Sequence, residues 1–212
     1  MTTSRAGDRV AAIIPVGTLA RAKSRLGETL DAEERQDLVD RLLARTVIAA
    51  LAVDGLDDVL VVSPDREVLA RAAGLGARTL RQRSRGLNAG LREAREGVVA
   101  GGATALLVLP IDLPFVSADA IRTVTDAAAT LPYPAVVLVP DRHGTGTNAL
   151  TLSPPDAIEF AFGRGSRAAH RAAAEAVGAS YREVDGPLTF DLDTPDDYVT
   201  VEAATREGVG AG

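Results

Sequence analysis

Two hydrophobic patterns alternate along this chain. Continuous apolar, often β-branched runs are typical of buried strands, and apolar residues recurring every three or four positions are typical of amphipathic helices. Their alternation predicts βαβ units around a mostly parallel sheet, so we expect an α/β fold. The expected strands lie at 10–16, 58–63, 77–80, 104–109, 135–139, 148–152, 181–184 and 188–192. The expected helices lie at 31–54, 65–73, 87–99 and 166–177, with two more starting after Ser117 and at Thr194.

Two helix starts carry specific capping signals. Asp31 is followed three residues later by Glu34, a spacing typical of a capping box. Thr194 precedes Pro195 and Asp197, which predicts threonine at the N-cap and proline at the first helical position. We expect one domain over residues 1–212, with frayed ends at 1–9 and 207–212.

Composition narrows the class of protein. The chain has no cysteine, which excludes a disulfide framework and a thiolate metal site. The net charge is −6 and aromatic residues make up only 3%, so a nucleic-acid partner is not expected. The first nine residues contain no apolar signal core, and no run approaches the length of a membrane span, so a cytoplasmic location without a membrane partner is expected.

A loop with three cations follows the first strand. Residues 17–27 resemble a Walker A loop, but Ala22 replaces its second glycine and the helix does not begin at Lys23. Arg21, Lys23 and Arg25 could neutralise a triphosphate, or they could simply be solvated. Lys23 is the only lysine in the chain, which favours a specific role for it.

Three aspartates are candidate metal ligands. Asp112 follows the most apolar strand, and a carboxylate near a core needs a cationic partner. Asp191 and Asp193 are two apart in an expected extended segment, so they face the same side while Leu192 faces the core. Carboxylates suit magnesium. Alternatively, Asp112 caps a turn and Asp193 marks a helix entry.

Two glycine-rich loops, 144–148 and 162–167, could bind a second phosphate. Glycine permits close approach of an anion, hydroxyls donate to phosphate, and Ser166 would open a helix. Ordinary turn chemistry explains either loop alone. Neither histidine belongs to a recognisable hydrolytic triad; we expect His170 on a helix surface and His143 in a loop lining the site.

With these residues in hand, the chain resembles the CofC/FbiD guanylyltransferases of coenzyme F-420 biosynthesis. The shared segments, taken in order, are Ile14-Pro15-Val16, Ala22-Lys23-Ser24-Arg25-Leu26, Leu87-Asn88-Ala89, 109–114, 141–148, 162–166 and 191–195. Each segment is weak by itself, but their order and spacing are fairly specific. The resemblance implies a Rossmann-like, GT-A-like nucleotidyltransferase fold.

The resemblance also implies a reaction and a set of site residues. GMP would pass from GTP to phosphoenolpyruvate or 2-phospho-L-lactate with release of diphosphate; the added Arg164 keeps 3-phosphoglycerate open as acceptor. The implied roles are catalysis by Lys23, Arg25 and Asp112, nucleotide binding by Pro15, Lys23, Asn88 and Pro110, acceptor binding by Thr147, Gly163 and Ser166, and Mg²⁺ binding by Asp112, Asp191 and Asp193. A homodimer, and transfer of the labile product to a downstream F-420 transferase, are compatible with it.

This chemistry needs no general base. A phosphate monoester is largely dianionic near neutral pH, so catalysis reduces to in-line positioning of two anions and stabilisation of the leaving diphosphate. Two alternatives stay open: a molybdopterin or sugar-phosphate nucleotidyltransferase, and a non-catalytic nucleotide-binding regulator.

Overall fold

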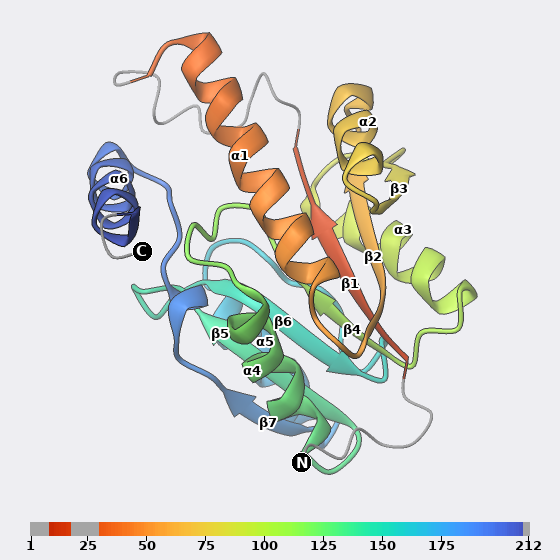
Figure 1. Ribbon diagram of the computed structural model, residues 1–212. Helices are drawn as coiled ribbons and strands as arrows, with labels where there is room; N and C mark the ends of the chain where they lie inside the picture. The colour runs from red at the N-terminus through yellow and green to blue at the C-terminus, as the bar shows by residue number, and fades with distance from the viewer. Residues whose placement is uncertain (1–8, 18–29, 210–212) are drawn as a thin grey trace.

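The computed structural model describes residues 9–17 and 30–209, and in this part of the chain helices cover both faces of one seven-stranded sheet (Figure 1). The strand order is β3-β2-β1-β4-β6-β5-β7, and every neighbouring pair is parallel except those that include β6. The strands are β1 Val10–Pro15, β2 Leu56–Ser63, β3 Arg78–Arg81, β4 Ala105–Val108, β5 Ala135–Pro140, β6 Thr147–Ser153 and β7 Ser180–Glu183. The expected α/β fold with a mostly parallel sheet is confirmed.

The helices divide between the two faces according to their apolar stripes. They are α1 Ala32–Leu51, α2 Arg66–Gly74, α3 Leu87–Ala100, α4 Ala118–Ala129, α5 Ser166–Ala176 and α6 Pro195–Val209. One apolar cluster joins α1, α2 and α4 to the sheet, and another joins α3 and α5 to its other face. Successive residues of β1 alternate between the clusters, Ala12 and Ile14 in the first and Ala11 and Ile13 in the second. A strand buried on both faces must therefore be apolar throughout.

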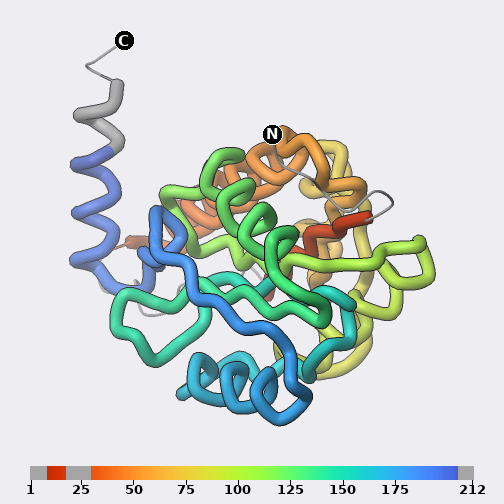
Figure 2. Tube along the Cα trace, turned by 90° about the horizontal axis from the view of Figure 1, so that it is seen from below, coloured from red at the N-terminus to blue at the C-terminus, as the bar shows by residue number. Residues whose placement is uncertain are grey.

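Both capping signals in the sequence are confirmed. The Asp31 carboxylate accepts hydrogen bonds from the backbone N–H groups of Glu33 and Glu34, and Glu34 bonds back to the Asp31 N–H, each at 2.9 Å. The Thr194 hydroxyl accepts a hydrogen bond from the Asp197 N–H at 3.3 Å, and α6 begins at Pro195. Figure 2 shows α6 at one side of the molecule.

One expected strand is wrong. Residues 188–192 do not form a continuous extended segment, because Pro187–Thr189 is a turn of 3₁₀ helix. The Gly186 N–H bonds to the Thr189 hydroxyl at 3.2 Å, and the Asn148 side chain donates to the carbonyls of Leu188 and Thr189 at 3.0 and 2.9 Å. The apolar Leu188 is buried from a turn, so its burial does not require a strand.

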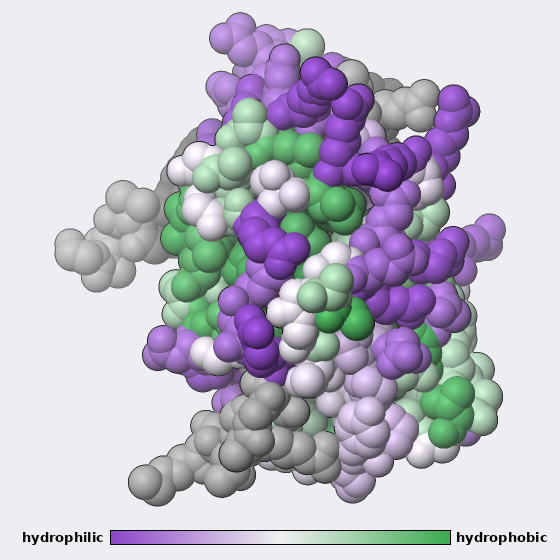
Figure 3. Space-filling model, turned by 90° about the vertical axis from the view of Figure 1, so that its right-hand side faces the viewer, coloured by the Kyte–Doolittle hydropathy of each residue, from purple (hydrophilic) through white to green (hydrophobic). Residues whose placement is uncertain are grey.

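The edge strand β3 is short and carries exposed arginines. Arg78 and Arg81 are both exposed, and Arg78 pairs with Asp58 of β2 at 2.5 Å. Charged side chains on an edge strand disfavour pairing with another chain. Figure 3, which looks at the right-hand side of Figure 1, shows much of this side as hydrophilic with apolar patches between.

Candidate active site

The carboxyl edge of β1 and β4 is the expected place for a ligand. The sheet order changes direction between these two strands, and ligands of open α/β sheets bind outside the carboxyl ends at such a switch point. β1 ends at Pro15, and the chain beyond β4 stays beside it for one more residue, because the Leu109 N–H bonds to the Ile13 carbonyl at 2.9 Å. Pro15 and Pro110, both predicted to bind nucleotide, are half-buried at this edge.

A backbone hydrogen bond brings the three predicted metal ligands into one region. The Leu192 N–H donates to the Asp112 carbonyl oxygen at 2.8 Å. Leu192 is fully buried, while Asp112, Asp191 and Asp193 are half-buried. Two segments 80 residues apart in sequence are thus held side by side, and the apolar Leu192 faces the core as expected.

The electrostatics of Asp191 reflect this crowding of carboxylates. Its pKa is raised, first by burial and then by the negative charges of Asp193 and Asp112, whereas Arg142 acts in the opposite direction. Asp191 Oδ1 is buried and has no hydrogen-bond partner among the described residues. A buried carboxylate oxygen without a partner is costly unless a cation meets it.

The carboxylate oxygens of these residues are suitable ligands for a divalent cation, but the side chains are not arranged around a common point. Carboxylate oxygens are the ligands preferred by Mg²⁺ and Mn²⁺. Within residues 9–17 and 30–209, however, no three acidic or histidine side chains already stand in a metal-binding arrangement. A cation at this place would have Asp191 Oδ1 as an available ligand, with Asp112 and Asp193 close by.

Asp197 organises this segment, a role that the sequence interpretation missed. Its Oδ2 accepts hydrogen bonds from the backbone N–H groups of Asp193 and Thr194 at 2.9 and 2.7 Å, and its Oδ1 lies 2.5 Å from Arg142 Nη1. The Arg142 guanidinium and these N–H groups hold the pKa of Asp197 well below its usual range, against the effect of burial. The capping pattern pointed to Asp197 as a helix start, but nothing in the sequence indicated its pairing with Arg142.

Arg142 lies in the loop that connects β5 and β6. Its guanidinium stacks on the Phe190 ring, 4.7 Å from the ring centroid. The loop turns on Asp141, whose Oδ1 accepts from the Thr145 N–H at 2.7 Å. A side chain at Gly146 would come within 2.7 Å of Asp141 Oδ2 and would displace the carboxylate that holds this turn. His143 is exposed in the same loop.

The second glycine-rich loop lies next to the first. Arg167 of α5 donates to the Gly144 carbonyl at 2.9 Å and pairs with Glu183 of β7 at 2.6 Å. Ser166, the first residue of α5, is buried, and the preceding Gly165 has a left-handed backbone and makes no side-chain cap. Two N–H groups of the first turn of α5 are already bonded, that of Ser166 to the Gly163 carbonyl at 3.1 Å and that of Arg167 to the Thr145 carbonyl at 3.3 Å, so the Arg167 N–H also joins the two loops.

His170 is not on the helix surface, and that prediction is wrong. Its side chain is fully buried, with Nδ1 3.1 Å from the Thr147 hydroxyl and Nε2 accepting from the Ala161 N–H at 2.9 Å. Burial lowers the pKa of His170 to about 4. The signal was present in the sequence, because His170 falls on the same helical face as Ser166 and Ala174, the two other buried residues of α5.

Asn88 contacts the same loop. Its amide accepts from the Phe162 N–H and donates to the Phe162 carbonyl, both at 2.9 Å. Asn88 therefore holds the loop before α5. Its role in nucleotide binding stays a prediction. Gly163, one residue further on, is exposed with a φ of 129°. Lys23 and Arg25, the predicted catalytic cations, lie outside the described residues.

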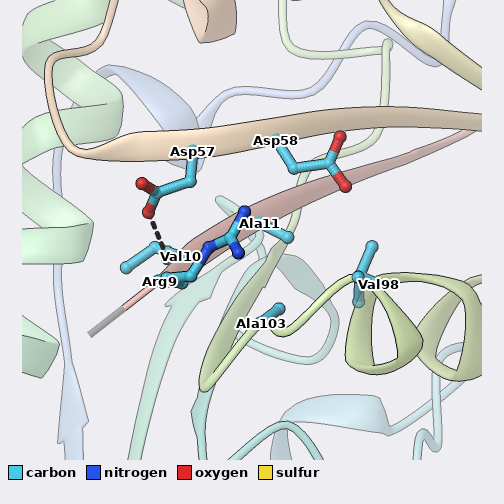
Figure 4. A pocket seen from close by; sticks show the side chains of 8 residues that line it. Arg9, Val10, Ala11, Asp57, Asp58, Val98 and Ala103 are labelled. Atoms are coloured by element: carbon cyan, nitrogen blue, oxygen red, sulfur yellow. Dashed lines mark hydrogen bonds between the residues drawn. The ribbon is translucent and has the colours of Figure 1, made fainter. Parts of the chain in front are cut away.

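A pocket at the other end of β1 is separate from this site. Figure 4 shows it between Arg9, Asp57, Asp58, Val98 and neighbouring residues, and the Val10 N–H donates to Asp57 Oδ2 at 2.9 Å. It lies at the amino end of the parallel strands, opposite Pro15. Its position does not suit the ligand site expected at a carboxyl edge.

This chain is similar to known proteins in sequence and, separately, in fold. A phosphoenolpyruvate guanylyltransferase of Sphaerobacter thermophilus is 47% identical over 202 residues, covering 94% of this chain and 95% of that protein. A putative nucleotide-diphospho-sugar transferase from Desulfovibrio desulfuricans G20 superposes with a TM-score of 0.72 at 12% identity, covering 88% and 83% of the two chains.

A third comparison concerns a structure that contains a metal. Glucosyl-3-phosphoglycerate synthase from Mycobacterium tuberculosis, solved with Mn²⁺ and uridine diphosphate, superposes with a TM-score of 0.60 at 13% identity and covers 93% of this chain and 76% of that one.

In the described part of this chain, none of the helices has the length and apolarity to span a membrane. Residues 10–203 match the family described as "Guanylyl transferase CofC like". This chain belongs to that family and is a nucleotidyltransferase.

Proposed function

We propose that this chain transfers GMP from GTP to phosphoenolpyruvate and releases diphosphate. The observation that carries the proposal is the 47% identity to a phosphoenolpyruvate guanylyltransferase over nearly the whole of both chains. 2-Phospho-L-lactate and 3-phosphoglycerate are the alternative acceptors, because each presents a phosphate and a carboxylate on three carbons. The product would be passed to a downstream F-420 transferase.

The site divides into two anion-binding regions. The nucleotide lies at the carboxyl edge of β1 and β4, beside Pro15 and Pro110, with Lys23 and Arg25 neutralising its phosphates. The acceptor lies between the two linked glycine-rich loops, where Thr147 and Ser166 donate hydroxyl hydrogen bonds and Gly163 permits close approach. The Arg167 bond to the Gly144 carbonyl supports this placement, because it joins the two loops.

Mg²⁺ is the proposed cofactor, held by Asp112, Asp191 and Asp193. The buried, unpartnered Asp191 Oδ1 supports this role. The ion would offset negative charge on the phosphates of GTP and the leaving diphosphate. Asp197 and Arg142 act on the ligands rather than on the substrate, since they fix the backbone of Asp193 and Thr194.

The proposed reaction does not require a protein side chain to remove a proton from the attacking group. The attacking oxygen belongs to a phosphate that is largely dianionic near neutral pH. His170 is buried, and burial lowers its pKa to about 4, so the ring is neutral near neutral pH. The chain's own residues therefore bind, orient and neutralise, which is how phosphoryl and nucleotidyl transfer are generally catalysed.

Diphosphate release tests the proposal. The purified protein is incubated with Mg²⁺, one of the four NTPs and each of the three acids. We expect release with GTP and phosphoenolpyruvate, and its loss in Asp112→Asn. Release with a sugar phosphate but none of the acids would support a sugar-phosphate nucleotidyltransferase instead. GTP binding without any release would support a non-catalytic regulator.

A further inference from the structure

His170 connects the three proposed acceptor residues, although it was assigned no role from the sequence. One ring nitrogen reaches Thr147 on β6 and the other reaches the Ala161 backbone. The ring also meets the Phe162 ring edge-on, with centroids 5.0 Å apart. Gly163 is the next residue after Phe162, and Ser166 lies three residues further along the chain. His170 thus links β6 to the loop that enters α5.

The direction of each hydrogen bond follows from the ring's protonation. The Ala161 N–H can only donate, so His170 Nε2 is the acceptor and carries no proton. A neutral ring then has its single proton on Nδ1, and this N–H donates to the Thr147 hydroxyl oxygen. Among the described residues the Thr147 hydroxyl makes no other hydrogen bond, so its own proton remains available to a further acceptor.

The backbone of the loop is held at three successive points. His170 holds the Ala161 N–H, and Asn88 holds both the N–H and the carbonyl of Phe162. His170 and Asn88 belong to different helices, α5 and α3. The placement of Gly163 relative to Thr147 therefore depends on these two side chains.

We infer that His170 is a positioning residue for the acceptor: it orients the Thr147 hydroxyl as a donor to the anionic acid and fixes the loop of Gly163 and Ser166 beside it. This inference rests on the proposed function, because it assumes that Thr147, Gly163 and Ser166 bind the acid. His170 itself touches neither substrate nor metal in this arrangement.

A double-mutant cycle tests the coupling. His170→Phe keeps a ring against Phe162 but removes both hydrogen bonds, and Thr147→Val removes the hydroxyl. We expect His170→Phe to raise the KM for phosphoenolpyruvate about tenfold, as for the loss of one hydrogen bond to an anion, with the KM for GTP unchanged. In the Thr147→Val background the same change should have a much smaller effect on the acceptor KM.

Thr151→Val is the matched control, because Thr151 is a buried threonine on the same strand whose hydroxyl has no hydrogen-bond partner in the part of the chain that the structure describes. It should leave both KM values unchanged. Equal rises in both KM values in His170→Phe, or additive effects in the double mutant, would overturn the inference, since a general loss of structure would explain them. A rise in acceptor KM for Thr147→Val but none for His170→Phe would overturn it and leave the proposed function standing.

Nuclear magnetic resonance of the wild-type protein provides a test that does not need a folded His170 variant. The ¹⁵N shifts of His170 should identify the Nδ1–H tautomer, and phosphoenolpyruvate should move the Nδ1 proton resonance in wild type but not in Thr147→Val. An Nε2–H tautomer, or no movement on saturation with the acid, would overturn the inference. GMP transfer to none of the acids by wild type would contradict the proposed function and the inference together.

Discussion

Asp197 and Arg142 join the last helix to the loop between β5 and β6 through an ion pair of 2.5 Å. The same carboxylate accepts the backbone N–H groups of Asp193 and Thr194. One side chain therefore sets the path of the segment that carries two proposed metal ligands. Because Asp197 is only 4% exposed, its pairing is not strongly weakened by solvent.

Replacing Asp197 should destabilise the protein in a pH-dependent way. We expect Asp197→Asn to lower the free energy of unfolding by about 2–4 kcal/mol at pH 7, because Arg142 is left without its buried partner. The folded-state pKa of Asp197 is depressed, so its contribution is full above the unfolded pKa of about 4 and is lost as the pH falls further. Urea unfolding of both proteins at pH 7 and at a series of values below pH 4 measures this difference.

The neighbouring Asp196→Asn is the control, since Asp196 is exposed in the first turn of the same helix. It should cost no more than about 1 kcal/mol, the usual value of a favourable helix-terminus charge. If the two variants unfold alike, the Arg142 pairing does not stabilise this region.

The Asp191→Asn substitution should raise the Tm of the metal-free protein and reduce the further rise in Tm caused by Mg²⁺. Without a divalent cation, Asp191→Asn removes a crowded, partly desolvated charge, so we expect the Tm to rise by about 1–3 °C. Added Mg²⁺ should raise the Tm of wild type much more than that of the variant, because ligands that bind only the folded state stabilise it. Thermal unfolding with and without MgCl₂ measures both effects.

Asp156→Asn serves as the comparison, because it removes one exposed negative charge elsewhere. Its response to Mg²⁺ should equal that of wild type. An equal Mg²⁺ response in Asp191→Asn would show that Asp191 is not a ligand.

Two buried threonines should respond in opposite ways to the same substitution. The Thr151 hydroxyl is buried without a hydrogen-bond partner among residues 9–17 and 30–209, so Thr151→Val should stabilise the protein by about 0.5–1 kcal/mol. The Thr46 hydroxyl donates to the Leu42 carbonyl at 2.9 Å, so Thr46→Val should bring no such gain and should cost up to about 1 kcal/mol. Urea unfolding at pH 7 compares them, and a destabilised Thr151→Val would mean that its hydroxyl has a partner in solution.

His170 should make the protein less stable in mild acid. Its folded-state pKa of about 4 lies below the unfolded value of about 6.5, so the unfolded chain binds a proton first. Stability should be full above pH 6.5 and fall by about 3 kcal/mol as the pH drops toward 4. Unfolding free energies of wild type and His170→Phe between pH 7.5 and 4 measure the slope assigned to this residue.

The exposed His143 provides the reference for that slope. His143→Gln should retain the wild-type dependence, whereas His170→Phe should have a shallower one. Identical slopes in wild type and His170→Phe would mean that acid destabilisation comes from other groups.

Much of the fold follows from local pattern. The capping box at Asp31, the start of α6 at Pro195 and the apolar strands were predictable, because each depends on residues close in sequence. The segment at 188–192 was misassigned because a buried Leu188 looks the same in a strand and in a turn. The prediction of a surface position for His170 is wrong because its helical spacing from Ser166 and Ala174 places it on the buried face of α5.

The amino-acid sequence by itself determined the α/β class, the family motifs and the candidate carboxylates, since these depend on residue type and spacing. Only the tertiary structure decided that Arg142 pairs with Asp197, that Leu192 bonds to Asp112, and that His170 bridges Thr147 and Ala161. Such contacts join segments separated by many residues, and their geometry is fixed by how the helices pack on the sheet. Spacing along a chain indicates which face of a helix is buried, but not which distant residue that face meets.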